Sequence, residues 1–286
     1  MTGIRLETRR GQLAALLAEP DSVAGGGAPA TVVMIPGLTG GKEDFAEVLP
    51  TLASASLRAI AIDLFGQQES DGTDDPGDYT LSALAADLLD LVTPLQVPVH
   101  LVGHSFGGIV AKEAVTQWPG VAAGGKPSVA SLTLLDSGPA GLPPGRRRDL
   151  TQALADSAMS FTPEQAWQLV VQVRSAEGTW PPPDAATAEF QRRRWITTRP
   201  AHHAGCARAL LSAPDRTEAL VAAGLAVAVI HGAEEDAWPA PLQAEMAARL
   251  GVPAVSVPAS GHSPASENPE ATAAALIAFL RQAGGA

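Results

Sequence analysis

Short apolar segments rich in β-branched residues alternate along this chain with segments of helical periodicity. The apolar segments lie at 31–35, 58–63, 98–103, 131–136, 226–232 and 253–258. Helical patterns follow them at 43–55, 81–92, 108–118, 241–251 and 267–282. Continuous apolar strands are typical of a sheet that is buried on both faces, and strand–helix alternation favours right-handed crossovers between parallel strands. The sequence therefore predicts an α/β fold with a mostly parallel central sheet and helices on both faces.

Two parts of the chain depart from this alternation. Near the N-terminus, the sequence GIRLETRRGQLAALLAE predicts a hairpin of two half-buried strands around Arg10–Gly11. Residues 139–215 contain almost no strand pattern but four helical segments, which proline-rich stretches separate. We expect 1–138 and 216–286 to form the core, and 139–215 to form a helical cap, or lid, inserted into it.

Composition and charge limit the class of partner. The chain has 286 residues, of which 46% are hydrophobic and 17% charged, so one large domain with a substantial core is expected. A formal net charge of −11 disfavours binding to nucleic acid or to an anionic membrane surface. The arginine clusters 146–148 and 192–194 are interpreted as solvated faces, with contact to an anionic substrate tail as the alternative. We expect a small-molecule substrate and a monomer or homodimer.

The single cysteine and the N-terminal sequence indicate the expected cellular location and bear on which cofactors are expected. Cys206 is the single cysteine, so neither an intramolecular disulfide nor a cysteine-based metal cluster is expected. The first residues, MTGIRLETRRGQL, lack the apolar region of a signal peptide, and no apolar run reaches 18 residues. These features predict a soluble cytoplasmic protein. No pattern of metal ligands and no strand-linked dinucleotide motif suggests a cofactor.

The stretch LVGHSFGGIV contains a serine between two glycines, directly after a predicted strand and before a predicted helix. The pentapeptide Gly103–Gly107 matches the G-x-S-x-G nucleophile elbow, in which a serine is raised on a tight strand-to-helix bend. Such a bend requires a backbone conformation that most side chains resist, and its flanking positions approach too closely for a Cβ atom. Ser105 is therefore the predicted nucleophile.

A serine hydroxyl needs a base, and one of the six histidines is best placed to supply it. His262 lies in SGHSP, in a loop directly after the last predicted strand, where open α/β sheets gather their sites. The others lie in predicted strands, in the elbow or in the helical segment: His100, His104, His202, His203 and His231. We therefore predict that His262 is the general base.

The base in turn needs a carboxylate that orients it and stabilises its cation. In this architecture the acid lies between the serine and the histidine in the sequence. The loop after segment 226–232 offers Glu235 and Asp236, and aspartate is the commoner residue in this role. Asp136, which follows segment 131–136 one strand earlier, is a third candidate. The residues alone leave these three open.

The oxyanion of a tetrahedral intermediate needs backbone donors. One is expected to be the N–H of Phe106, directly after the nucleophile, and the other to come from the loop IPGLTGG after segment 31–35. Pro36 has no N–H, so Leu38 is the predicted donor. The alternative for this loop is an ordinary glycine-rich turn.

Together, IPGLTGGKEDF, IDLFGQQESDG, GHSFGG, LLDSGP, HGAEEDAWP and SGHSP resemble the α/β-hydrolase fold superfamily over nearly the whole chain, and within it a group of lidded bacterial serine hydrolases. Members usually carry aspartate three residues after the glycine of the acid loop and proline four residues later. Here these positions are Glu235 and Pro239, which keeps both acids open. Serine as the nucleophile argues against the dehalogenases and epoxide hydrolases of this fold, which use aspartate.

Two further departures from the superfamily concern the loops. Pro36-Gly37 replaces the usual His-Gly of the oxyanion loop, which bears on how that loop is held. The segment that commonly reads D-x-x-G-H-G-x-S has Gln67 and Gln68 in its centre, a difference interpreted as confined to the loop.

The resemblance implies a cofactor-free enzyme that cleaves a carboxylic ester, lactone or thioester of a small apolar substrate through an acyl-enzyme. Candidate pocket residues are His104, Phe161, Trp167, Trp195 and Trp238. For each aromatic residue of the helical segment, a place in that segment's own core is the alternative. Two other functions remain open: C–C bond hydrolysis or lyase or cyclase chemistry in the same pocket, and ligand binding without catalysis.

Overall fold

The computed structural model describes residues 1–22, 28–117, 129–178, 180 and 184–283. Its centre is an eight-stranded sheet with the strand order β1-β2-β4-β3-β5-β6-β7-β8. The strands are β1 (Thr2–Thr8), β2 (Gly11–Ala18), β3 (Thr31–Ile35), β4 (Arg58–Ile62), β5 (Val99–His104), β6 (Val129–Leu135), β7 (Ala226–Gly232) and β8 (Ala254–Val257). The hairpin β1–β2 and the β2–β4 pair are antiparallel, and all pairs from β4 to β8 are parallel. The predicted α/β class with a mostly parallel sheet is confirmed.

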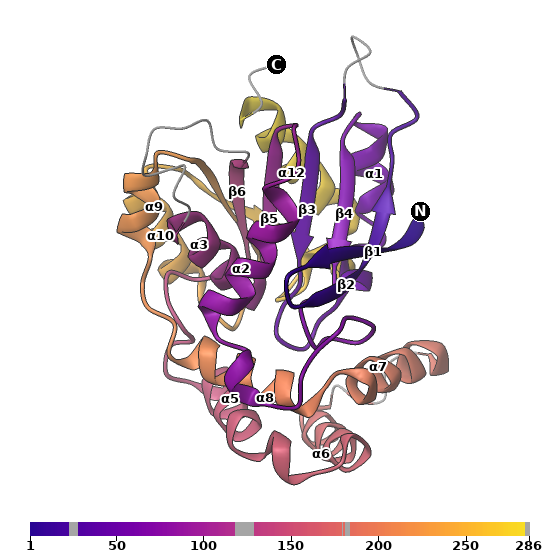
Figure 1. Ribbon diagram of the computed structural model, residues 1–286. Helices are drawn as coiled ribbons and strands as arrows, with labels where there is room; N and C mark the ends of the chain where they lie inside the picture. Colours follow the sequence, from indigo (N-terminus) through magenta and orange to yellow (C-terminus); the bar gives the residue numbers. More distant parts are fainter. Residues whose placement is uncertain (23–27, 118–128, 179, 181–183, 284–286) are drawn as a thin grey trace.

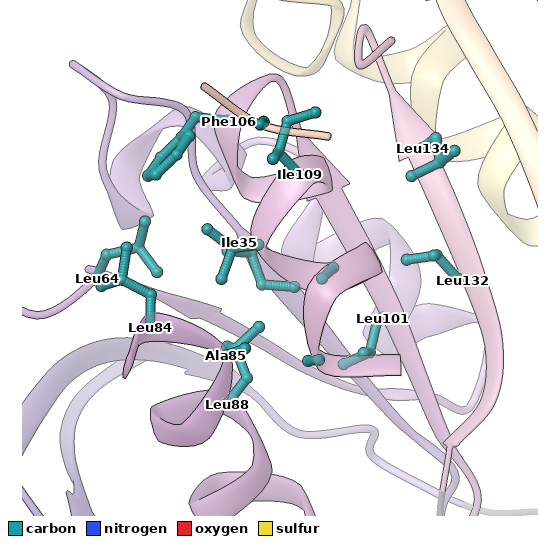
Figure 2. Packing of buried hydrophobic residues seen from close by; sticks show 14 of the residues in the cluster. Ile35, Leu64, Leu84, Ala85, Leu88, Leu101, Phe106, Ile109, Leu132 and Leu134 are labelled. Atoms are coloured by element: carbon teal, nitrogen blue, oxygen red, sulfur yellow. The ribbon is translucent and has the colours of Figure 1, made fainter. Parts of the chain in front are cut away.

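Each face of the sheet packs against its own set of helices. Val33 and Ile35 of β3 belong to a core shared with α2 (Leu81–Val92) and α3 (Phe106–Gln117). Their neighbours in the same strand, Val32 and Met34, point into a second core with α1 (Leu49–Ser54) and α12 (Pro269–Ala283). Figure 2 shows the first core, in which Ile35 of β3 lies close to Leu84 and Leu88 of α2. Burial on both faces explains why the central strands are apolar throughout.

The predicted helix over 43–55 is wrong in its extent. The structure has a short 3-10 helix, η2 (Lys42–Phe45), and α1 begins only at Leu49. Pro50 is the physical reason: it has no N–H to continue a helix, and its ring fits only in the first turn, which is where α1 places it. The short helix α9 (Thr217–Ala223) was not anticipated.

Four helices and a short 3-10 helix lie between β6 and β7, within the segment 139–215. They are α5 (Arg146–Ser157), η4 (Ala158–Ser160), α6 (Pro163–Ala176), α7 (Ala185–Thr197) and α8 (Pro200–Leu211). Thr162 and Asp184 accept N-cap hydrogen bonds at the starts of α6 and α7. These helices, the α5–α8 segment, lie at one end of the sheet, at the bottom of Figure 1. His202 of α8 contacts the backbone of the loops after β3 and β4, so this is the end where the parallel strands finish.

The chain closes with α10 (Ala240–Leu250), α11 (Pro264–Glu267) and α12. Gly251 caps the end of α10 with a φ of +72°, a left-handed conformation that glycine adopts without strain. None of the helices in the described ranges combines the length and apolar character needed to cross a membrane.

Candidate active site

Ser105 sits on a sharp bend between β5 and α3. Its φ is +53°, a left-handed conformation that is costly for a residue with a side chain. A Cβ on Gly103 would lie 2.5 Å from Gly108 Cα, and one on Gly107 would lie 2.3 Å from the carbonyl oxygen of Ile35. Both positions therefore require glycine, and the pattern in the sequence follows from this close packing.

Three side chains form a continuous row of hydrogen bonds at the carboxyl ends of the strands. Ser105 Oγ lies 3.0 Å from His262 Nε2, and Glu235 Oε2 lies 2.7 Å from His262 Nδ1. The three come from loops after β5, β7 and β8. Ser105 is 7% exposed, and the side chains of His262 and Glu235 are 17% and 0% exposed. The row is largely shielded from water, with its open side at the histidine and serine.

The loop after β7 distinguishes Glu235 from Asp236, two of the three acids that the residues left open. Oε1 of Glu235 accepts hydrogen bonds from the N–H groups of Ala237 and Trp238, at 2.6 and 2.9 Å. Burial opposes ionisation of Glu235, but hydrogen bonding and the charge of His262 outweigh it and lower the pKa of Glu235 to about 2. Asp236 does not join this row. Its side chain is 58% exposed and forms an ion pair with Arg147 of α5, at 2.8 Å.

A third carboxyl lies behind the row. Asp136, directly after β6, is fully buried, and its Oδ1 accepts a hydrogen bond of 2.9 Å from the N–H of Gly232. One ligand atom each from Asp136, Glu235 and His262 lie within 4.8 Å of one another, a spacing that is open to a metal ion. A metal would have to replace the proton that His262 Nδ1 donates to Glu235. Because His262 Nε2 contacts Ser105 at the same time, the arrangement fits a hydrogen-bonded row better than a metal site.

The loop after β3 passes directly beside Ser105. A Cβ on Gly37 would lie 3.2 Å from the Cβ of Ser105. The carbonyl of Gly37 accepts a hydrogen bond of 2.9 Å from Gln67 Nε2. In a trans peptide the next N–H points the opposite way, so the N–H of Leu38 is directed away from Gln67. Neither this N–H nor that of Phe106 donates to another residue in the described ranges.

Two of the predicted pocket residues, His104 and Trp238, lie next to His262. His104 Nε2 lies 2.6 Å from the backbone oxygen of His262, which can only accept a hydrogen bond. Burial and the neighbouring His262 lower the pKa of His104 to about 4, so its ring is neutral at pH 7 and donates from Nε2. The Trp238 ring lies 6.2 Å from that of His262, and its Nε1 donates to the carbonyl of Ala140.

Trp167 and Trp195, two other predicted pocket residues, have ring contacts within the α5–α8 segment. Trp167 is 4% exposed and packs against Trp180 and Trp195, with ring centroids 5.3 and 6.4 Å apart. Trp195 stacks on His203 at 4.5 Å. Phe161 is 38% exposed. For Trp167 and Trp195, these contacts favour the alternative in which they form part of the segment's own core.

The sequence did not single out two residues that hold the loop after β3. Gln67 is fully buried, and His202 of α8 lies 3.3 Å from the carbonyl of Leu38 through Nε2. Gln67 falls in the segment that departs from the common superfamily pattern, and its bond to Gly37 shows that this departure extends beyond its own loop. The departure from the superfamily pattern was the sequence signal that could have pointed to Gln67. The sequence around His202 carries no such signal, because its partner Leu38 is 164 positions away.

The arginine clusters link the α5–α8 segment to loops of the site. Arg147 pairs with Asp236 beside Glu235, and Arg194 of α7 pairs with Asp44 in η2, after the Gly37–Leu38 loop. The side chains of Arg194 and Asp44 are 18% and 19% exposed. Arg192 pairs with glutamates of α6 and α7. The clusters are thus partly solvated and partly used to join the segment to the core.

Comparisons with known proteins agree with this architecture. A thermophilic esterase from Thermogutta terrifontis, solved with malate bound, superposes with a TM-score of 0.75 and 21% identity over 99% of both chains. The enol-lactonase from Burkholderia xenovorans LB400 gives 0.74 and 17% identity over 97% of this chain and 99% of its own. At these identities the likeness shows the fold.

Sequence comparisons give the family. A putative carbamate hydrolase, RutD, from Pantoea ananatis (strain LMG 20103) is 33% identical over 90 residues, which are 31% of this chain and 32% of that protein. The match therefore spans about a third of the length of the curated relative. The model of the alpha/beta hydrolase family matches residues 32–275, which include Ser105, Glu235 and His262. This chain belongs to the alpha/beta hydrolase family.

Proposed function

We propose that this protein is a cofactor-free serine hydrolase that cleaves a carboxylic ester, lactone or thioester of a small apolar substrate through an acyl-enzyme. The observation that carries the proposal is the unbroken row from Ser105 Oγ through His262 to Glu235, with contacts of 3.0 and 2.7 Å. Nucleophile, base and orienting acid are all within hydrogen-bond distance before any substrate binds, as this chemistry requires.

The first half-reaction forms the acyl-enzyme. Ser105 Oγ attacks the carbonyl carbon while His262 Nε2 takes the hydroxyl proton, and Glu235 stabilises the resulting imidazolium through Nδ1–H. The negative oxygen of the tetrahedral intermediate is held by the N–H groups of Phe106 and Leu38. The intermediate collapses when His262 returns the proton to the leaving oxygen or sulfur.

The second half-reaction repeats these roles with water. His262 takes a proton from water, the resulting hydroxide attacks the acyl carbon, and Ser105 leaves with the proton that His262 gives back. Glu235 is the acid in both steps. Asp236, the other acid of this loop, forms an ion pair with Arg147. Asp136 accepts a hydrogen bond from the N–H of Gly232 and not from His262.

We also propose that segment 139–215 is a cap over this site. In support, His202 of α8 contacts the carbonyl of Leu38, and Arg194 of α7 pairs with Asp44. The similar proteins include an esterase, an enol-lactonase and a putative carbamate hydrolase, which fits a reaction at an acyl carbonyl. None of these names sets the acyl length of the substrate of this chain.

The proposal is tested by comparing wild type with Ser105→Ala. Both are treated with a fluorophosphonate probe and assayed on p-nitrophenyl esters of increasing chain length, and the labelled peptide is identified by mass spectrometry. Ser137→Ala is the matched control, because Ser137 is also buried and lies behind the elbow against Gly108. We expect wild type and the control to be labelled at Ser105 and to turn over esters, and Ser105→Ala to do neither.

Two results would count against the proposal. Labelling of wild type without hydrolysis of any ester would favour C–C hydrolase or lyase chemistry on the same serine. Equal labelling of wild type and Ser105→Ala would remove Ser105 from the chemistry altogether.

A further inference from the structure

Asp136 and Glu235 form a buried pair of carboxyls directly behind His262. We infer that Asp136 is a positioning residue that is protonated in the resting enzyme and donates a hydrogen bond from Oδ2 to Glu235, so that the two carboxyls carry one negative charge between them. The inference rests on the proposed function in one respect: it assigns a partner to the proposed acid of the triad. The proton itself can be observed without any assay of hydrolysis.

The geometry places both carboxyls out of reach of bulk water. Asp136 is 0% exposed, and so is the side chain of Glu235. One oxygen atom of each carboxyl lies within 4.8 Å of the other and of a ring nitrogen of His262. Asp136 is held at the end of β6 with a φ of +45°, and its own N–H donates to the carbonyl of Ile230 in β7. Its position relative to the acid loop is therefore fixed by the backbone of two adjacent strands.

A count of hydrogen bonds shows where a proton is needed. Oδ1 of Asp136 accepts from the N–H of Gly232. Oδ2 is buried and, in the described part of the chain, has no donor to satisfy it. Glu235 is better supplied: Oε1 accepts two backbone N–H groups, and Oε2 accepts from His262. Two ionised carboxylates would face each other as acceptors, whereas a proton on Oδ2 gives each a partner.

Electrostatics decides which of the two carries the proton. Two buried carboxylates so close together cannot both ionise at an acceptable cost, so one stays neutral. Burial, the contact with Glu235 and the charge of Glu267 raise the pKa of Asp136 to about 9, against the single backbone donor that lowers it. Glu235, by contrast, accepts hydrogen bonds from the imidazole of His262 and from two backbone N–H groups, which stabilise its ionised form. The charge therefore stays on Glu235, beside the histidine that it must stabilise.

The consequence for catalysis is the orientation of Glu235. The side chain of a glutamate has three rotatable bonds, one more than that of an aspartate, and a donor behind it limits the positions of its Oε2. The hydrogen bond of Asp136 would keep Oε2 directed at His262 Nδ1 throughout the reaction. Asp136 touches neither substrate nor the reacting atoms, so it acts only through Glu235.

Two substitutions at the same position separate a donor from a charge. Asp136→Asn keeps an oxygen for the N–H of Gly232 and presents an N–H to Glu235. Asp136→Gly removes both. Asparagine and glycine both tolerate a positive φ, so neither change strains the backbone at this position. We expect Asp136→Asn to retain the rates of ester hydrolysis and of fluorophosphonate labelling to within roughly threefold. We expect Asp136→Gly to lose about 10- to 100-fold in kcat, with little change in KM.

Two readouts would not respond to a purely structural role. The infrared C=O band of a protonated carboxylic acid should be present in wild type at pH 7 and absent from Asp136→Asn. The kcat/KM of wild type should fall above about pH 9, where Asp136 ionises against Glu235, and this fall should be missing in Asp136→Asn. The charged and titratable groups that face Asp136 are Glu235, Glu267 and, beyond Glu235, His262.

The inference is overturned if the infrared band is the same in wild type and Asp136→Asn, or if Asp136→Asn is as impaired as Asp136→Gly. The second result would mean that Asp136 acts as an ion. If Asp136→Asn abolishes labelling while Glu235→Gln does not, Asp136 is itself the acid of the triad. A failure of the proposed function is distinct, because it appears as continued labelling of Ser105→Ala and leaves the infrared result readable.

Discussion

Glu235 contacts His262 at 2.7 Å, although the aspartate next to it in the sequence is the residue type that usually takes this position. The backbone of the acid loop explains the choice, because Ala237 and Trp238 direct their N–H groups at Glu235. Asp236 is turned outward to Arg147. The longer side chain of Glu235 thus reaches from the loop to His262, while the shorter one of Asp236 pairs with Arg147 in the α5–α8 segment.

The first prediction concerns these two neighbouring acids. Glu235→Gln should lower kcat by roughly 10³- to 10⁴-fold, because an amide neither stabilises the imidazolium nor enforces the tautomer that the base needs. Asp236→Asn should change kcat by less than about threefold, because its partner Arg147 lies at the exposed surface. Steady-state kinetics of both variants on one ester decides the matter. A larger loss in Asp236→Asn would show that the two acids exchange places in solution.

The second prediction concerns the elbow. Gly107→Ala would place a Cβ 2.3 Å from the oxygen of Ile35 and 2.6 Å from that of Pro36, both backbone atoms. Either the elbow or the loop after β3 must move, so the free energy of unfolding should fall by roughly 1–3 kcal/mol and labelling of Ser105 should slow by at least an order of magnitude. Gly3→Ala is the control, since a Cβ on Gly3 meets nothing within 4 Å. Denaturant unfolding and labelling rates measured on both variants test this prediction, and equal effects would contradict it.

The fold was predictable where the signal is local. The apolar run at β3 and the amphipathic pattern at α2 gave their elements with the observed bounds, because burial on both faces and burial on one face leave different periods in a sequence. The helix over 43–55 failed although Pro50 was a local signal against it. The prediction rested on the spacing of the apolar residues and did not take into account that Pro50 has no N–H to donate.

The site was predictable only in part, for a different reason. Short motifs led to the elbow and to His262, which lies 3.0 Å from Ser105, since tight packing constrains the glycines of the elbow. The choice between Glu235 and Asp236 depends on how a loop folds against β8, and the contact of Gln67 with Gly37 joins residues 30 positions apart. Contacts of this kind depend on how distant segments pack and leave no period in the sequence.

The third prediction concerns two buried histidines and the loss of stability at acidic pH. Burial, with the neighbouring His202, lowers the pKa of His203 to about 3, and burial lowers that of His202 to about 4. In the unfolded chain both bind a proton below about pH 6.5, so the unfolded state gains protons first as the pH falls. The contribution of these two neutral histidines to the free energy of unfolding should therefore be fully present above pH 6.5 and decrease as the pH falls toward 4.

Substitution of His203 tests this by removing one titrating group. His203→Phe keeps an aromatic ring against Trp195, and the pH dependence of its unfolding free energy between pH 6.5 and 4 should decrease by about one proton. Trp195→Phe is the matched control: it weakens the same stack but should leave the pH dependence unchanged. Urea unfolding at several pH values measures both. The same pH dependence in wild type and His203→Phe would show that His203 does not contribute.

The last prediction concerns the link between α7 and the loop beside the nucleophile. Arg194 and Asp44 are each less than one-fifth exposed, and Asp44 also accepts the N–H of Gly41 at 3.1 Å. Arg194→Met should leave Asp44 without its cation, loosen the proposed cap and lower kcat/KM by roughly tenfold, because a hydrogen bond between charged groups in a partly buried setting contributes that much.

Arg192 provides the matched control. It lies on the same helix, pairs with Glu164 and Glu189 and is 37% exposed, so Arg192→Met should change kcat/KM by less than about twofold. Kinetics at low and high salt refine the test, because screening should weaken the link of wild type and leave Arg194→Met less sensitive to salt. If both variants lose the same activity, the effect comes from the charge of α7 as a whole and not from its contact with Asp44.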